Sequence, residues 1–118
     1  MLQWIKGRWQ SFNYALQGLK GVLASGPNMR IMLVAAVVVV GAGLWLGIGP
    51  ADWGFVTIAI TLVIAAEAFN TAIERLTDIV QPERDPRAGQ VKDLASAGVL
   101  LASIGAAVLG WLVFEKYL

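Results

Sequence analysis

Four polar side chains follow directly on the apolar run FVTIAITLVIAA in this sequence: Glu67, Asn70, Glu74 and Asp78. They are spaced three, four and four residues apart, so they form one stripe on a helix that turns about 100° per residue. Ionisable groups at membrane depth are costly and normally face a protein interior or a wet cavity, so we interpret Glu67 as a functional residue. For Asp78, simple exposure to water at a helix end is an equally good interpretation.

A lysine and an aspartate, Lys92 and Asp93, stand at the start of the next apolar segment. A lysine ammonium is a point charge suited to a phosphate, and carboxylates on a facing helix are suited to Mg²⁺. The stripe and Lys92 together indicate phosphoryl transfer, in which a protein mainly positions the reactants and neutralises charge. Neither a Walker P-loop nor a protein-kinase glycine-rich loop is present, so a nucleotide must bind in another way. The alternative is that Lys92 only reaches the membrane interface and pairs with Asp93 or Asp78.

The composition indicates that these residues belong to a small membrane protein. Of 118 residues, 58% are hydrophobic and 14% charged, whereas soluble domains carry about 25% charged residues. The chain has no cysteine and no histidine, which excludes thiolate and imidazole chemistry and leaves carboxylates and amines as acids and bases. The net charge of +1 gives no support to a nucleic-acid partner.

Three segments are long enough to cross a bilayer as helices, which takes about 20 mostly apolar residues. We expect them at 31–48, 53–80 and 94–114, with a cytoplasmic loop over 81–92 and Asp52 as the N-cap of the second span. At 1.5 Å per residue the second helix is about 42 Å long, so it should project past the hydrocarbon.

The first part of the chain, 2–25, has a different pattern. Six apolar residues repeat every three or four positions and share one helical face: Ile5, Trp9, Phe12, Leu16, Leu19 and Leu23. The remaining faces carry lysine, arginine and glutamine, which is typical of a helix that lies in the interface against anionic headgroups. The sequence therefore predicts one all-α membrane domain over 1–118, with an interfacial helix followed by three transmembrane helices.

The distribution of positive charge predicts the orientation. Eight of the nine lysine and arginine residues precede the first span or lie around the loop between the second and third: Lys6, Arg8, Lys20, Arg30, Arg75, Arg84, Arg87 and Lys92. The positive-inside rule places the N-terminus and this loop in the cytoplasm. The aromatic residues Trp45, Trp53, Trp111 and Tyr117 then gather at the outer interface.

Two motifs carry a resemblance to a known family. The pattern ExxNTAIExxxD at 67–78, followed by VKDLASAGVLL at 91–101, resembles the small integral-membrane diacylglycerol kinase and undecaprenol kinase family of bacteria. SFNYALQGLKG at 11–21 and NMR at 28–30 extend the similarity over nearly the whole chain. The resemblance implies a homotrimeric lipid kinase of the bacterial cytoplasmic membrane that uses ATP and Mg²⁺, with active sites between neighbouring chains. The lipid acceptor could be diacylglycerol or undecaprenol.

The same resemblance implies a role for each candidate residue. Glu67 would be the general base on the lipid hydroxyl with Asn70 beside it, and Glu74 would hold Mg²⁺. The implied nucleotide site comprises Lys92, which meets the ATP phosphates, with Asp78 and Asp93.

The sequence also departs from the family pattern. A glutamate that usually joins Glu74 on the metal aligns with Gly26, a histidine common in the loop aligns near Asp85, and an acidic or histidine position aligns with Met32. A catalytically impaired or scaffolding relative of the same fold therefore stays open as an alternative. A small transporter in which Glu67 couples protons is the other alternative, but it leaves the interfacial helix and Lys92 unexplained.

Overall fold

The computed structural model describes all residues, 1–118, and consists of helices joined by short connections. The elements are α1 (Leu2–Leu23), α2 (Pro27–Leu46), α3 (Pro50–Val80), α4 (Pro86–Phe114) and the short 3₁₀ helix η1 (Glu115–Tyr117). The predicted all-α fold class is confirmed. The connections between the helices are short, so each helix can pack directly against its neighbour in sequence.

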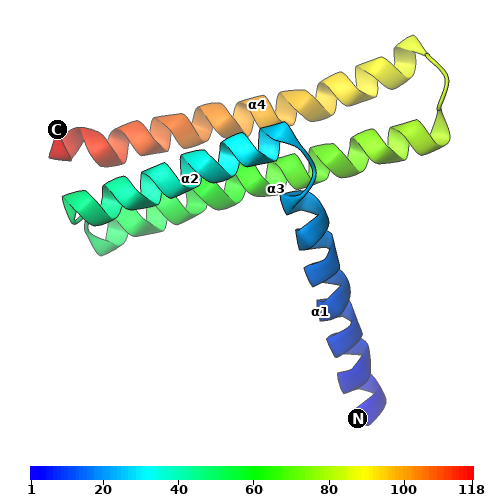
Figure 1. Cartoon of the computed structure of the whole chain (residues 1–118), viewed down its shortest axis with the longest axis horizontal. Coiled ribbons are helices and arrows are strands. Elements are labelled where there is room, and N and C mark those ends of the chain that lie inside the picture. Colours follow the sequence, from blue (N-terminus) through cyan, green and yellow to red (C-terminus); the bar gives the residue numbers. More distant parts are fainter.

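The helices α2, α3 and α4 are each long and apolar enough to cross a membrane. They run side by side, and α3 makes its most extensive contact with α4 (Figure 1). The α3–α4 hairpin extends well beyond the start of α2, as expected for a second span that projects past the hydrocarbon (Figure 1). The three spanning helices that the sequence predicts are therefore present.

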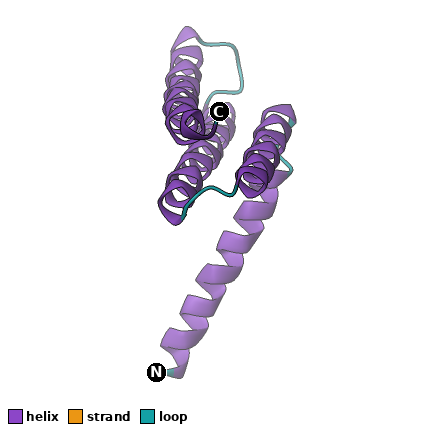
Figure 2. Ribbon diagram, turned by 90° about the vertical axis from the view of Figure 1, so that its left-hand side faces the viewer, coloured by secondary structure: helices purple, strands orange, loops and turns teal.

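The first helix, α1, leaves the bundle at a steep angle near the start of α2 (Figures 1 and 2). Every residue of α1 up to Lys20 is exposed, and so is Leu23, so all six apolar residues of the predicted face are exposed. No other part of the single chain covers this apolar face, and the direction of α1 is compatible with a helix that lies along the membrane surface while the bundle crosses it.

Proline begins each of the three spanning helices, because its fixed φ and missing N–H fit the first helical turn. This corrects two predictions. The N-cap of α3 is Gly49 and not Asp52, and α4 begins at Pro86 and not at 94, so the loop expected over 81–92 is confined to 81–85.

The early start of α4 has a local cause in Asp85. Its side chain caps the helix by accepting a hydrogen bond from the backbone N–H of Arg87 at 2.8 Å, and the Arg87 guanidinium donates to the same carboxylate. These bonds hold the pKa of the Asp85 carboxyl below its usual value. As a consequence, Lys92 and Asp93 lie in the second turn of a helix and not in a loop.

The best-buried apolar cluster lies at the opposite end of the bundle and is small, comprising Ile48, Val56 and Val113. Next to the turn that begins α3, Asp52 is 6% exposed and ties this end together. Its carboxylate accepts from Lys116 Nζ at 2.7 Å and from the Tyr117 hydroxyl at 2.6 Å. This clasp, defined as Asp52, Lys116 and Tyr117, joins the first turn of α3 to η1.

Candidate active site

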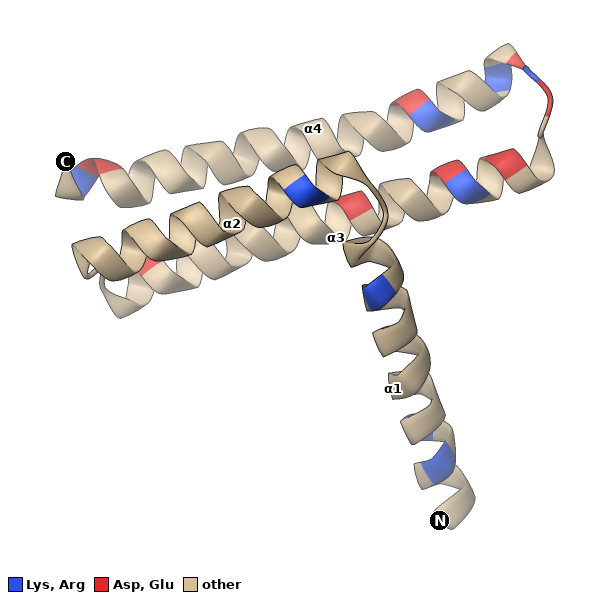
Figure 3. Ribbon diagram, viewed as in Figure 1, with Lys and Arg blue, Asp and Glu red and all other residues tan.

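A polar cleft of about 440 Å³ lies between the segment that joins α1 to α2 and the C-terminal half of α3. Its lining residues come from two short stretches: Ser25, Gly26, Pro27, Asn28 and Met29 on one wall, and Glu67, Asn70, Thr71, Glu74, Arg75 and Asp78 on the other. Met29 is the single hydrophobic residue among them. Figure 3 shows that, apart from one acidic position at the start of α3, the acidic positions of this helix lie between this connection and the α3–α4 loop.

The whole predicted polar stripe lines this cleft. Because α3 is one uninterrupted helix from Pro50 to Val80, the spacing of three and four residues keeps the stripe on one face. The structure therefore brings together Glu67, Asn70, Glu74 and Asp78. It also supplies a second wall, formed by 25–29, that the stripe alone did not reveal.

Two side chains at the Glu67 end of the stripe are buried, and each has an oxygen without a hydrogen-bond partner. Glu67 and Asn70 are each 6% exposed, and neither Glu67 Oε2 nor Asn70 Oδ1 has a hydrogen-bond partner. The Asn70 amide donates to Glu74 Oε1 at 3.2 Å, which leaves its carbonyl oxygen free. Unpaired buried polar atoms are costly, so this pair of oxygens indicates a place where a ligand binds.

The lysine predicted to meet a phosphate lies at the Asp78 end of the stripe, next to the α3–α4 loop. Lys92 Nζ contacts Asp78 Oδ1 at 2.5 Å, although the two residues are on different helices. Their side chains are 38% and 62% exposed, so the pair is open to water and worth only about 0.2–1 kcal/mol. Asp93 is exposed and does not line the cleft. The structure thus links Lys92, but not Asp93, to the cleft.

The residues of the cleft fit a magnesium ion that keeps part of its own coordination. No three carboxylate, histidine or cysteine side chains of this chain converge closely enough to hold a metal unaided. One carboxylate, Glu74, and the unpartnered Asn70 oxygen are available, and Mg²⁺ commonly retains several waters and takes oxygens from a nucleotide. The two acceptors therefore suit a hard cation that takes its remaining oxygens from water and from a second ligand.

Sequence reasoning missed two groups. The wall formed by 25–29 was seen only as a departure at Gly26, yet polar residues just before an apolar span are a signal for such a wall. The clasp was also missed, although Lys116 is the one cation expected on the outer side and Asp52 belongs to the outer turn. The predicted topology placed both on the same side, and pairing them would have been a reasonable step.

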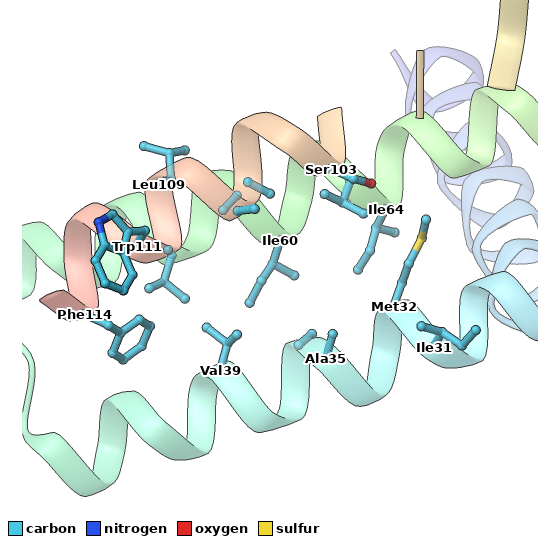
Figure 4. Close-up of a pocket in the computed structure, with 17 residues that line it drawn as sticks. Ile31, Met32, Ala35, Val39, Ile60, Ile64, Ser103, Leu109, Trp111 and Phe114 are labelled. Carbon is cyan, nitrogen blue, oxygen red and sulfur yellow. The ribbon is translucent and has the colours of Figure 1, made fainter. Parts of the chain in front are cut away.

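A second cavity, also of about 440 Å³, is apolar and opens between α2 on one side and α3 and α4 on the other (Figure 4). Aliphatic side chains dominate its lining, with Val39 and Met32 from α2 facing Ile60 and Ile64 from α3 (Figure 4). Ile64 lies one helical turn before Glu67, and Met32 lies one turn after Met29. The apolar cavity therefore adjoins the polar cleft.

Comparison with known proteins gives a consistent picture. Residues 13–114 match the protein family described as prokaryotic diacylglycerol kinase. The chain is 26% identical to the undecaprenol kinase of Bacillus subtilis, over 90% of this chain and 86% of that protein. It is 30% identical to the diacylglycerol kinase of Escherichia coli K12, over 85% of this chain and 81% of that protein. The diacylglycerol kinase of Haemophilus influenzae is likewise 30% identical, over 78% of each chain.

Proposed function

The chain belongs to the prokaryotic diacylglycerol kinase family, and on that basis we propose that it is an ATP- and Mg²⁺-dependent lipid kinase. Its membership confirms the resemblance carried by the motifs at 67–78 and 91–101. The acceptor is the hydroxyl of a membrane lipid, either diacylglycerol or a polyprenol such as undecaprenol. Both are named among the relatives.

One observation carries the proposal beyond membership of the family. The buried Glu67 carboxylate, with Oε2 unpartnered, lies where the polar cleft adjoins the apolar cavity. An amphiphilic alcohol fits such a boundary, because its hydrocarbon chain can occupy apolar surroundings while its hydroxyl reaches the carboxylate. The cavity lining is aliphatic, so it favours hydrocarbon without selecting one lipid over another.

The placement of the side chains supports the following assignment of roles in the reaction. The lipid hydroxyl oxygen forms a bond to the γ-phosphorus of ATP, the bond from that phosphorus to the ADP oxygen breaks, and Glu67 takes the hydroxyl proton. Asn70 lies beside the proposed base, one helical turn from Glu67, and its unpartnered carbonyl oxygen is available to the cation that accompanies ATP. Lys92 neutralises phosphate charge once it leaves Asp78, and the weakness of that exposed pair makes the exchange inexpensive.

Glu74 would hold Mg²⁺, and Asp78 and Asp93 would complete the nucleotide site. When bound, Mg²⁺ neutralises charge on the phosphate oxygens as the phosphoryl group transfers. Asn70 positions the Glu74 carboxylate for this task through the 3.2 Å hydrogen bond to Oε1. The role of Asp93 rests on the family resemblance, since it lies outside the cleft in the single chain.

We place the protein in the bacterial cytoplasmic membrane with its N-terminus inside, as a homotrimer. The concentration of lysine and arginine at the end that carries the cleft supports this orientation, because ATP is then available on the same side (Figure 3). In this position α1 lies along the inner surface with its exposed apolar face in the interface.

The test is phosphate transfer from γ-labelled ATP to extracted membrane lipids by the purified protein, with diacylglycerol and undecaprenol as separate acceptors. Mg²⁺-dependent label in one lipid class supports the kinase and identifies its acceptor. Absence of label with both acceptors and with total lipid, from protein that is folded and trimeric, would favour the scaffolding relative. Proton uptake without label would favour a transporter.

A further inference from the structure

We infer that Asn28 supplies the cation ligand on the α2 wall of the polar cleft, opposite Glu74. This inference rests on the proposed kinase function and names a residue of the same site. It concerns the side-chain amide oxygen of Asn28, which would coordinate the divalent ion that accompanies ATP.

The oxygens available on the α2 wall leave one candidate. Among the wall residues 25–29, only Ser25 and Asn28 have a side-chain oxygen. The Ser25 hydroxyl is held by its hydrogen bond to the Val22 carbonyl at 2.7 Å. Asn28 is exposed at the cleft, and its side chain makes no hydrogen bond within the protein. It is therefore free to turn its amide oxygen toward an ion.

The backbone at Gly26 explains why a carboxylate does not serve on this wall. Gly26 has φ of 145° and ψ of −166°, a conformation that is essentially restricted to glycine. A glutamate at this position would impose a strain of about 1–3 kcal/mol on the connection, even though a Cβ there meets no neighbouring atom. Gly26 itself has no side-chain oxygen, and its carbonyl accepts from the backbone N–H of Arg30 at 3.3 Å, so we place the ligand at another residue of this wall.

Asn28 is also held in a fixed place. It lies between two residues that are themselves fixed. Pro27 is the first residue of α2 and has a fixed φ, and the side chain of Met29 is 0% exposed. Met29 is the largest fully buried side chain of the protein, so the first turn of α2 is anchored beside α3. A ligand between these two residues is positioned before the ion arrives, which lowers the cost of binding it.

The facing wall provides complementary oxygens. Glu74 uses Oε1 to accept from Asn70, and the Asn70 carbonyl oxygen is buried and unpartnered. Together the two walls offer one negative oxygen and two neutral amide oxygens. Such a set suits a hard cation that also binds phosphate, because the phosphates supply the remaining negative charge.

The experiment measures Mn²⁺ binding, which does not depend on turnover. The loss of the free-ion electron paramagnetic resonance signal is titrated with protein in detergent, with one equivalent of a non-hydrolysable ATP analogue and a protein-free blank. Asn28→Ala should weaken Mn²⁺ binding by about tenfold, in the range seen when residues of a metal site are removed. Asn28→Asp should bind at least as tightly as the wild type, since it keeps an oxygen at the same place and adds charge.

Asn13→Ala is the matched control, because Asn13 lies on the exposed face of α1 outside the cleft and should bind as the wild type does. Wild-type affinity in Asn28→Ala overturns the inference, as does equal weakening in Asn28→Asp and Asn28→Ala, or no Mn²⁺ binding by the wild type. If Mn²⁺ binding depends on Asn28 while no lipid is phosphorylated, the kinase proposal fails and the ligand assignment stands. If lipid is phosphorylated and Asn28→Ala binds Mn²⁺ normally, only the ligand assignment fails.

Discussion

Replacing Glu67 by glutamine separates catalysis from folding, because the change keeps the size of the side chain and removes its basic oxygen. Oε2 of Glu67 has no partner in the protein, so no hydrogen bond between Oε2 and the protein is lost with the charge. We therefore expect a change in unfolding free energy below about 1 kcal/mol. General-base catalysis contributes about 10²–10⁴-fold, so turnover should fall at least about 10²-fold, which corresponds to roughly 2.7 kcal/mol in the activation barrier.

The assay is the initial rate of label transfer from ATP to lipid in mixed micelles, at saturating ATP and varied lipid. The apparent KM for ATP should stay near the wild-type value, because Glu67 lies at the end of the stripe away from Lys92. Glu83→Gln is the control for loss of one carboxylate, since Glu83 is exposed in the α3–α4 loop. A turnover within about threefold of the wild type in Glu67→Gln would refute the assignment of the base.

Three further changes test separate parts of the structure. Lys92→Ala should lower turnover far more than it raises the KM for lipid. Lys92→Arg should restore turnover only in part, because the wider planar group places its charge differently. If Lys92→Arg is fully active and Lys92→Ala reduces only stability, Lys92 is a membrane anchor and not a catalytic residue. Gly26→Ala and Gly26→Glu should each lower the free energy of unfolding by about 1–3 kcal/mol, measured by thermal unfolding. Wild-type stability in Gly26→Ala would show that the positive φ carries no strain. Lys116→Met should lower the midpoint of thermal unfolding more than Lys6→Met does. In Lys116→Met the buried Asp52, which is 6% exposed, loses its counter-charge, whereas Lys6 forms no ion pair. Equal midpoints in the two variants would argue against a stabilising clasp.

The fold and the stripe could be predicted because both depend on local periodicity. Long apolar runs fix the spanning helices, and the spacing of the polar residues from Glu67 to Asp78 fixes their common face whatever packs against it. The start of α4 was missed because Pro86 was interpreted as part of a loop. Proline at the first helical position with Asp85 as cap favours a helix instead, so the signal was present.

The second wall of the cleft could not be predicted in the same way. Asn28 and Glu74 are 46 positions apart in the sequence, and no periodic pattern connects them. Their shared cleft depends on how the first turn of α2, with its buried Met29, packs beside α3. The pairing of Lys92 with Asp78 was foreseen as the alternative to catalysis, and the structure shows that this pair borders the cleft.

Gly26 connects the shape of the protein to the chemistry of its cleft. Its positive φ lies at the connection where α1 turns away from the bundle, so the residue that allows this turn is also the one that provides no ligand (Figure 1). If Asn28 is the ligand that we propose, the loss of a carboxylate at 26 is not by itself a sign of an inactive relative, because Asn28 lines the same cleft two residues later, in the first turn of α2. A single neutral ligand in place of a carboxylate weakens the hold on the free ion more than the hold on an ion already bound to ATP, since the phosphates then carry the negative charge. Under the proposed assignment of Asn28, we therefore expect the metal to be taken up together with the nucleotide and not independently of it.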